Sequence, residues 1–198
     1  MAAANPIHRL TEAEYLAIER RAEFKSEFFD GEMFAMSGGT KPHSLIASNL
    51  NFALRTQLKG CPCRVYTSDM RVKVQASGLC TYPDLSVVCG QDLIEDEHDD
   101  VLLNPTVIIE ILSDSLEAYD RGRKFELYRG LASLREYVLV SQHKPLIENF
   151  VRQDSGAWLL LETAGLEGKV NLPSLGISIE MADVYTNIRF VPIRLHPK

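Results

Sequence analysis

Hydrophobic positions recur at helical spacing in three stretches of the chain. Thr11 and Glu14 have the spacing of a capping box, which predicts a helix over about 12–21. Residues 43–60 place apolar side chains three or four positions apart and predict a second helix. The same spacing over 115–130 predicts a third helix, which ends near a glycine.

Other stretches alternate in polarity or are apolar on both faces, which predicts strands. The alternation over 23–37 breaks at Asp30-Gly31, a two-residue turn signal that predicts a hairpin. Further strands are predicted at 64–74, 81–88, 105–112, 134–142, 146–153 and 157–162. The strand that begins at Pro105 is apolar on both faces, which is typical of a sheet centre covered on two sides. The order of elements indicates an α/β (α+β) fold with helices on the faces of a sheet.

The length and composition limit the class of protein. The 198 residues suit one domain with its own core, so we expect a single domain over 1–198. No apolar run approaches the ~18 residues of a membrane span, and no signal-peptide pattern opens the chain. We therefore expect a cytoplasmic protein with no membrane partner.

The formal net charge of −6 argues against a protein that coats nucleic acid by bulk attraction. Any contact with nucleic acid would have to be local. The acidic run at 91–100 is typical of a solvated surface loop.

The four cysteines are predicted to be thiols, because the chain shows no secretory signal. They are Cys61, Cys63, Cys80 and Cys89. The one-residue gap between the first two is wrong for a zinc knuckle, so we expect no zinc site.

Two apolar strands each contain one carboxylate, Asp84 near the start of the first and Glu110 within the second. A buried charge costs several kcal/mol unless it has a partner. If the strands are neighbours the two carboxylates would repel, and a shared cation would relieve that repulsion. Carboxylate oxygens, a backbone carbonyl and water suit Mg²⁺.

The third predicted helix adds Asp120, Lys124 and Tyr128 at four-residue steps. At about 100° per residue, Asp120 falls on the apolar face of that helix, with Lys124 at its edge. These side chains could line a pocket over Glu110. The alternative is a surface Asp–Lys pair whose lysine stem extends to solvent.

Glu27 and His43 each have two interpretations. Glu27 lies on the predicted hairpin, where an exposed strand face is natural. His43 opens the second predicted helix, and it is either a capping or surface residue or a base. The chain has no GxSxG, HExxH or GxxxxGK[ST] motif, so nucleophilic serine or cysteine catalysis lacks support.

Four segments in a fixed order resemble a bacterial restriction endonuclease family within the PD-(D/E)XK nuclease superfamily. They are YPDLSVV at 82–88, PTVIIEILSDS at 105–115, D-RGR-K-FEL-Y at 120–128 and LREYVLV at 134–140. Residues 27–50 and 171–185 are similar to the N-terminal hairpin with its histidine-bearing helix and to the C-terminal end of that family. The resemblance covers nearly the whole chain and implies a restriction endonuclease-like mixed sheet flanked by helices.

The resemblance also implies roles for single residues. Asp84 would be the aspartate of the PD pair and Glu110 the acidic residue of the second half-motif. The lysine of the superfamily usually stands two positions after that acid, where this chain has leucine. Lys124 on the following helix would replace it, and Glu27 matches the N-terminal glutamate of the family.

The implied activity is metal-dependent hydrolysis of phosphodiester bonds, most simply in DNA. Mg²⁺, or Mn²⁺ in its place, would be held by Asp84, Glu110 and the backbone carbonyl of Ile111. We expect nucleic acid as partner and a homodimer or higher homo-oligomer, because a duplex has two strands to cut. A nuclease fold that binds without cleaving, and a hydrolase for another phosphate ester, stay open as alternatives.

Overall fold

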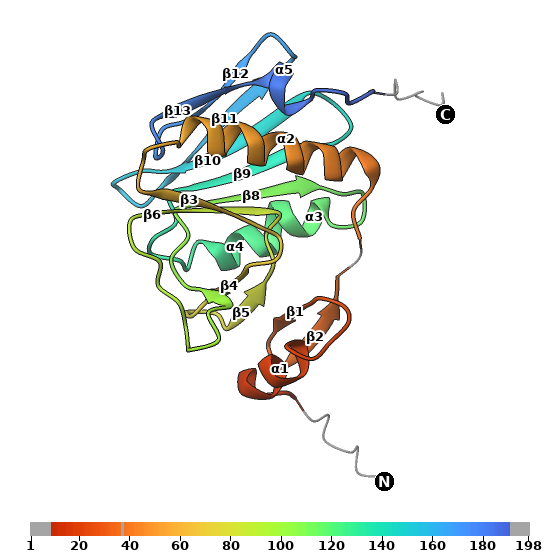
Figure 1. The fold of residues 1–198 in the computed structure, drawn as a ribbon, viewed down its shortest axis with the longest axis vertical. Coiled ribbons are helices and arrows are strands. Elements are labelled where there is room, and N and C mark those ends of the chain that lie inside the picture. The colour runs from red at the N-terminus through yellow and green to blue at the C-terminus, as the bar shows by residue number, and fades with distance from the viewer. Residues whose placement is uncertain (1–8, 37, 191–198) are drawn as a thin grey trace.

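The computed structural model describes residues 9–36 and 38–190 (Figure 1). The helices are α1 (Glu12–Glu19), α2 (Lys41–Gln57), α3 (Glu117–Tyr119), a π-helical segment η1 (Asp120–Lys124), α4 (Phe125–Tyr128) and α5 (Met181–Val184). The strands are β1 (Ser26–Phe29), β2 (Glu32–Ala35), β3 (Cys63–Thr67), β4 (Arg71–Val74), β5 (Leu79–Thr81), β6 (Leu85–Cys89), β7 (Val101–Leu102), β8 (Val107–Leu112), β9 (Glu136–Ser141), β10 (Leu146–Arg152), β11 (Trp158–Ala164), β12 (Lys169–Leu172) and β13 (Ile177–Glu180).

A six-stranded mixed sheet forms the centre, in the order β11-β10-β9-β8-β6-β3. The pair β8 and β9 is parallel, while β8 runs antiparallel to β6. Helix α2 lies on one face of this sheet, and α3 and α4 lie on the other (Figure 1). This arrangement confirms the predicted α+β architecture.

Successive side chains of β8 enter two separate cores, as strand geometry requires. Ile109 and Ile111 pack with α2, β12, β13 and α5. Ile108 and Leu112 pack with α4 and with strands of the second sheet. Glu110 therefore faces the layer that contains α3, η1 and α4.

The second sheet has five strands in the order β2-β1-β5-β4-β7. Its hairpin turns at Asp30 and Gly31, whose φ angles of 50° and 81° are both positive and match the turn that the sequence predicts. Helix α1 packs on this sheet through Tyr15, which stacks on Phe28 at 4.8 Å between ring centroids. Thr11 and Glu14 form the predicted capping box.

Two predicted strands are each divided between the two sheets. The chain turns after Thr67, so residues 64–74 form β3 in the large sheet and β4 in the small one. Residues 81–88 are divided in the same way, because β5 ends at Thr81 and β6 begins only at Leu85. The prediction of single strands was wrong because the alternation of polar and apolar residues does not reveal a change of sheet.

The third predicted helix is also irregular. It consists of α3, η1 and α4 in succession, with one wide turn over Asp120–Lys124. Wide turns of this kind are uncommon and often occur at functional sites. The β12–β13 hairpin and α5 have no counterpart among the predicted elements.

The acidic segment after β6 is anchored rather than freely solvated. Arg20 binds Asp100 at 2.8 Å and Asp96 at 2.9 Å. Arg71 also binds Asp100, at 2.8 Å. The segment lies at the surface as predicted, but it is not a free loop, because Arg20 and Arg71, which are far away in sequence, bind its carboxylates.

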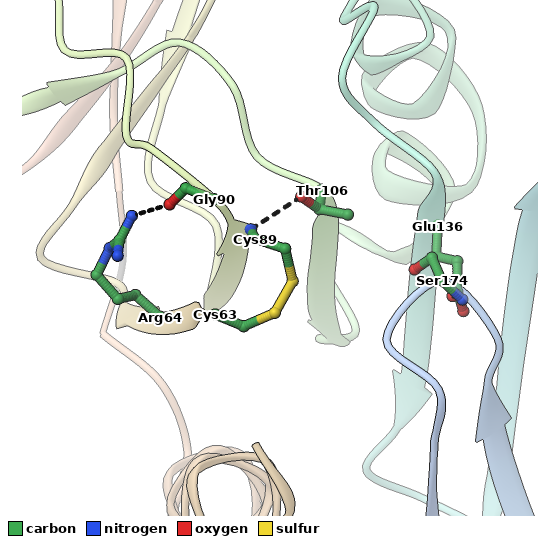
Figure 2. Close-up of a disulfide and its surroundings, with 7 residues drawn as sticks. All are labelled: Cys63, Arg64, Cys89, Gly90, Thr106, Glu136 and Ser174. Carbon is green, nitrogen blue, oxygen red and sulfur yellow. Dashed lines mark hydrogen bonds between the residues drawn. A yellow bond between two sulfur atoms is a disulfide. The ribbon is translucent and has the colours of Figure 1, made fainter. Parts of the chain in front are cut away.

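The prediction that all four cysteines are thiols was wrong for two of them. Figure 2 shows a disulfide between Cys63 on β3 and Cys89 on β6. These residues are direct partners in the antiparallel pairing of the two strands. Cys61 and Cys80 are free, the first exposed and the second buried.

In the described part of the chain, no helix combines the length and apolar character needed to cross a membrane.

Candidate active site

A cavity of about 720 Å³ opens between the start of α2, the β5–β6 connection, the end of β8 and η1. Its lining includes Asp84, Glu110 and Lys124, together with His43 and Asp120. The fold thus brings together residues that lie up to 81 positions apart in the sequence.

Strand pairing explains why the two carboxylates meet. Leu85 of β6 lies opposite Ile109 of β8, so Asp84 comes next to Glu110. The Asp84 backbone N–H lies 3.5 Å from Glu110 Oε2, and Asp84 Oδ2 accepts a 2.7 Å hydrogen bond from the Ile111 N–H. Asp84 is therefore anchored at the end of its strand, while 17% of its side chain reaches the cavity surface.

Lys124 is almost completely buried, with 4% of its side chain exposed. Its Nζ lies 2.8 Å from Glu110 Oε1 and 3.5 Å from Asp120 Oδ1. Tyr128 donates a 3.0 Å hydrogen bond to the same Glu110 oxygen. The alternative of a solvent-exposed Asp–Lys pair is wrong, because the lysine points inward between two carboxylates.

The site carries more negative than positive charge. Burial raises the pKa of Glu110 to about 8; Lys124 opposes this shift, while Asp120 and Asp84 add to it. Burial disfavours the charge on Lys124, but Glu110 and Asp120 outweigh burial and raise the pKa of the lysine. Burial also raises the pKa of Asp120 despite the nearby lysine. An added cation would stabilise this group of carboxylates.

Glu27 lies behind the cavity rather than on its described lining. It is 8% exposed, accepts a 2.7 Å hydrogen bond from Thr81 Oγ1, and accepts another from the Tyr119 hydroxyl. The interpretation of an exposed strand residue is wrong. Glu27 instead ties β1 to β5 and to α3, and its charge contributes to the raised pKa of Lys124.

His43 has a more central place than its position in the sequence suggested. Thr40 is the N-cap of α2 and accepts the His43 backbone N–H, so the imidazole need not cap the helix. The ring Nε2 lies 3.2 Å from Asp84 Oδ2, so the imidazole faces the carboxylate that precedes β6. The hydrogen bond to Asp84 raises the pKa of His43, against the effect of burial.

Gln142 was missed by the sequence analysis. It accepts a 2.6 Å hydrogen bond from Thr40 Oγ1 and donates a 2.9 Å bond to the Leu112 carbonyl. It thereby holds the start of α2 against the end of β8. No local motif marks Gln142. The spacing of Thr40 and His43 could have indicated that Thr40 caps the helix, which leaves the His43 side chain available for another role.

The donor set suits a cation that keeps much of its water. Within the described chain, no three His, Cys, Asp or Glu side chains are grouped so as to hold a metal ion. Mg²⁺ commonly uses only one or two protein carboxylates. Asp84 and Glu110 supply two, and Glu110 Oε2 receives only the 3.5 Å contact from Asp84 among the described residues. The residues present therefore fit a hydrated divalent cation.

Comparisons with known proteins show the family of this chain. Residues 12–182 match the family model Uma2, described as a putative restriction endonuclease. Two proteins of Synechocystis sp. are similar in sequence. The uncharacterized protein slr1290 is 35% identical over 185 residues, covering 93% of this chain and 96% of its own length. The uncharacterized protein sll1609 is 32% identical over 168 residues, covering 85% and 95%.

A crystal structure of a putative nuclease belonging to DUF820 from Anabaena variabilis has a similar fold. It superposes with a TM-score of 0.72 at 18% identity and covers 89% of this chain and 98% of its own. At that identity the similarity shows the fold alone. The match over 12–182 shows the family, and the chain belongs to the Uma2 family of putative restriction endonucleases.

Proposed function

We propose that the protein is an endonuclease that hydrolyses phosphodiester bonds in DNA. The observation that carries this proposal is the buried Glu110–Lys124 pair, which lies beside Asp84 at the wall of an open cavity. A buried lysine that is held between carboxylates has few structural advantages, since apolar residues of similar volume are often equally stabilising. Its position suits chemistry on an anionic substrate.

Asp84, Glu110 and the Ile111 carbonyl would hold Mg²⁺, for which Mn²⁺ is an alternative. When bound, the cation would polarise the phosphate and lower the pKa of a coordinated water. The fit rests on Glu110 Oε2, which receives only the 3.5 Å contact from Asp84 among the described residues, and on the excess of negative charge described above.

The side chains of the protein would position the reacting groups. The Lys124 ammonium would orient the attacking water or stabilise the charge that develops on the phosphate. Tyr128 and Asp120 would hold Glu110 and Lys124 in place through their contacts. Glu27 would act one layer further out, through Tyr119.

Cleavage assays with single variants test the assignment. Asp84→Asn, Glu110→Gln and Lys124→Met should each abolish Mg²⁺-dependent cleavage of plasmid DNA, because each removes a charge from the site. Asp154→Asn, in an exposed turn, is a matched control and should cleave as wild type does. Wild-type rates in all three site variants would end the assignment.

The same assay should include duplex DNA, single-stranded DNA, RNA and nucleotides. Cleavage of nucleotides alone would indicate a hydrolase for another phosphate ester. Binding of nucleic acid by folded wild type without any cleavage would indicate the inactive binding module.

A further inference from the structure

The segment that contains α2 is free of acidic residues. Residues 38–68 include no aspartate or glutamate, although the chain has 27 of them. The same segment contains Lys41, Arg55, Lys59 and Arg64. A protein with a net charge of −6 therefore has a local cationic stretch, and this stretch begins at the catalytic cavity.

The outward face of α2 and the turn that follows it display the cationic side chains along one line. Ser44, Ser48, Phe52, Arg55 and Lys59 follow one another at steps of three or four residues, and all are exposed. Phe52 is the one large apolar side chain among these five residues, and 74% of it is exposed. Exposed aromatic rings beside cationic side chains are where unpaired bases stack in proteins that bind single strands.

Hollows on the surface connect this line to the catalytic cavity. Ser48 and Asn51 line both that cavity and a second hollow, which Phe52, Arg55 and Lys59 also line. Arg55 and Lys59 in turn line a third hollow beside β3. The surface therefore offers a continuous path that leaves the catalytic cavity along α2.

The cations on this path are available for a ligand. Neither Arg55 nor Lys59 has an ion-pair partner in the described part of the chain. Other basic residues are neutralised locally, for example Arg64 by Asp92 at 2.7 Å. A helix rise of ~1.5 Å per residue places Arg55 about 16 Å from Ser44, so the path is longer than a single nucleotide.

We propose that this face of α2 binds a single-stranded segment of the nucleic-acid substrate next to the phosphate that is cleaved. Arg55 and Lys59 pair with backbone phosphates, and Phe52 stacks on an unpaired base. Ser48 and Asn51 provide hydrogen-bonding groups between the cations and the site. The inference rests on the proposed nuclease function, which locates the phosphate that is cleaved. It adds that the substrate has a single-stranded segment next to that phosphate.

Binding measurements without divalent cations test this inference apart from catalysis. Fluorescence anisotropy would compare a labelled single-stranded oligonucleotide with the same sequence as a blunt duplex. The variant R55Q/K59Q should bind the single strand at least tenfold more weakly. Its slope of log K against log salt should be smaller by about 1.4, for two phosphates at ~0.7 each.

Phe52→Ala should weaken binding to the single strand by about tenfold and leave duplex binding and the salt slope unchanged. The matched controls are R21Q/K144Q, which removes two exposed cations elsewhere, and Phe34→Ala, which removes another exposed aromatic ring. Both controls should bind as wild type does.

Wild-type affinity in R55Q/K59Q, or equal losses in R21Q/K144Q, would overturn the binding path. Equal losses of single strand and duplex in Phe52→Ala would overturn the stacking. If Asp84→Asn still cleaves while R55Q/K59Q binds weakly, the proposed active site fails and the binding path stands. If the site variants lose cleavage while R55Q/K59Q binds normally, only the binding path fails.

Discussion

Lys124 belongs to the candidate active site and also affects the stability of the fold. Its ammonium neutralises part of the charge of Glu110 and Asp120, and only 4% of its side chain is exposed. Removing one partner of a buried pair costs more than removing both, because the remaining charge is left without compensation.

We therefore expect Lys124→Met to lower the free energy of unfolding by about 3 kcal/mol, since it leaves two buried carboxylates unpaired. The double variant E110Q/K124M should recover part of this loss. Urea denaturation of wild type, both single variants and the double variant measures the coupling. Strictly additive effects would show that the two side chains do not interact.

Gly39 is a second residue whose role depends on a single contact. A Cβ at this position would lie 2.7 Å from His43 Nδ1, which is too close for the ring to stay where it is. The same addition at Gly38 meets nothing within 4 Å. The two neighbouring glycines therefore provide a test and its control.

Gly39→Ala should reduce the cleavage rate by at least tenfold, because it displaces the ring that contacts Asp84, and small displacements in a catalytic site are costly. Gly38→Ala should cleave at close to the wild-type rate. Single-turnover assays of both variants at saturating metal make the comparison. Equal rates would mean that the contact between His43 and Asp84 does not matter for cleavage.

Among the elements, those with a local signal were predictable, whereas the interrupted ones and the β12–β13 hairpin were not. The capping box of α1, the Asp30-Gly31 turn and the apolar run of β8 act locally, so the sequence revealed them. The wide turn of η1 and the division of residues 64–74 between two sheets depend on distant contacts.

Asp84, Glu110 and Lys124 could be proposed because each charge lies in an apolar pattern. His43 was undervalued because its partner is 41 positions away.

The acidic segment after β6 gives a prediction at this scale. Hydrogen bonding to Arg20 lowers the pKa of Asp100 and of Asp96 in the folded state. A lowered pKa contributes stability that is present above the unfolded pKa of about 3.9 and is lost as pH falls through the folded value.

Arg20→Ala should therefore lower the free energy of unfolding at neutral pH. The difference from wild type should shrink as pH falls below the unfolded value of about 3.9 and through the lowered folded values, because the carboxylates then become protonated in both states. Urea denaturation of the two proteins across this range provides the measurement. A difference that is unchanged at low pH would show that Arg20 acts through packing instead of charge.

For the molecule as a whole, assembly is the prediction that follows from the proposed reaction. One active site cuts one strand, so cleavage of both strands of a duplex is simplest in a symmetric pair. Sedimentation equilibrium should therefore give about twice the mass of the 22.2 kDa chain. A monomer at micromolar concentration that still cuts both strands would contradict this expectation.

The three-residue connection between β5 and β6 has a consequence for how the molecule tolerates change. It leaves one sheet at Thr81 and enters the other at Leu85, and Asp84 is its last residue. The orientation of this carboxylate therefore depends on how the two sheets pack against each other. Substitutions deep in the smaller sheet, remote from any ligand, should appear in an unbiased mutational screen as losses of activity without loss of the folded protein.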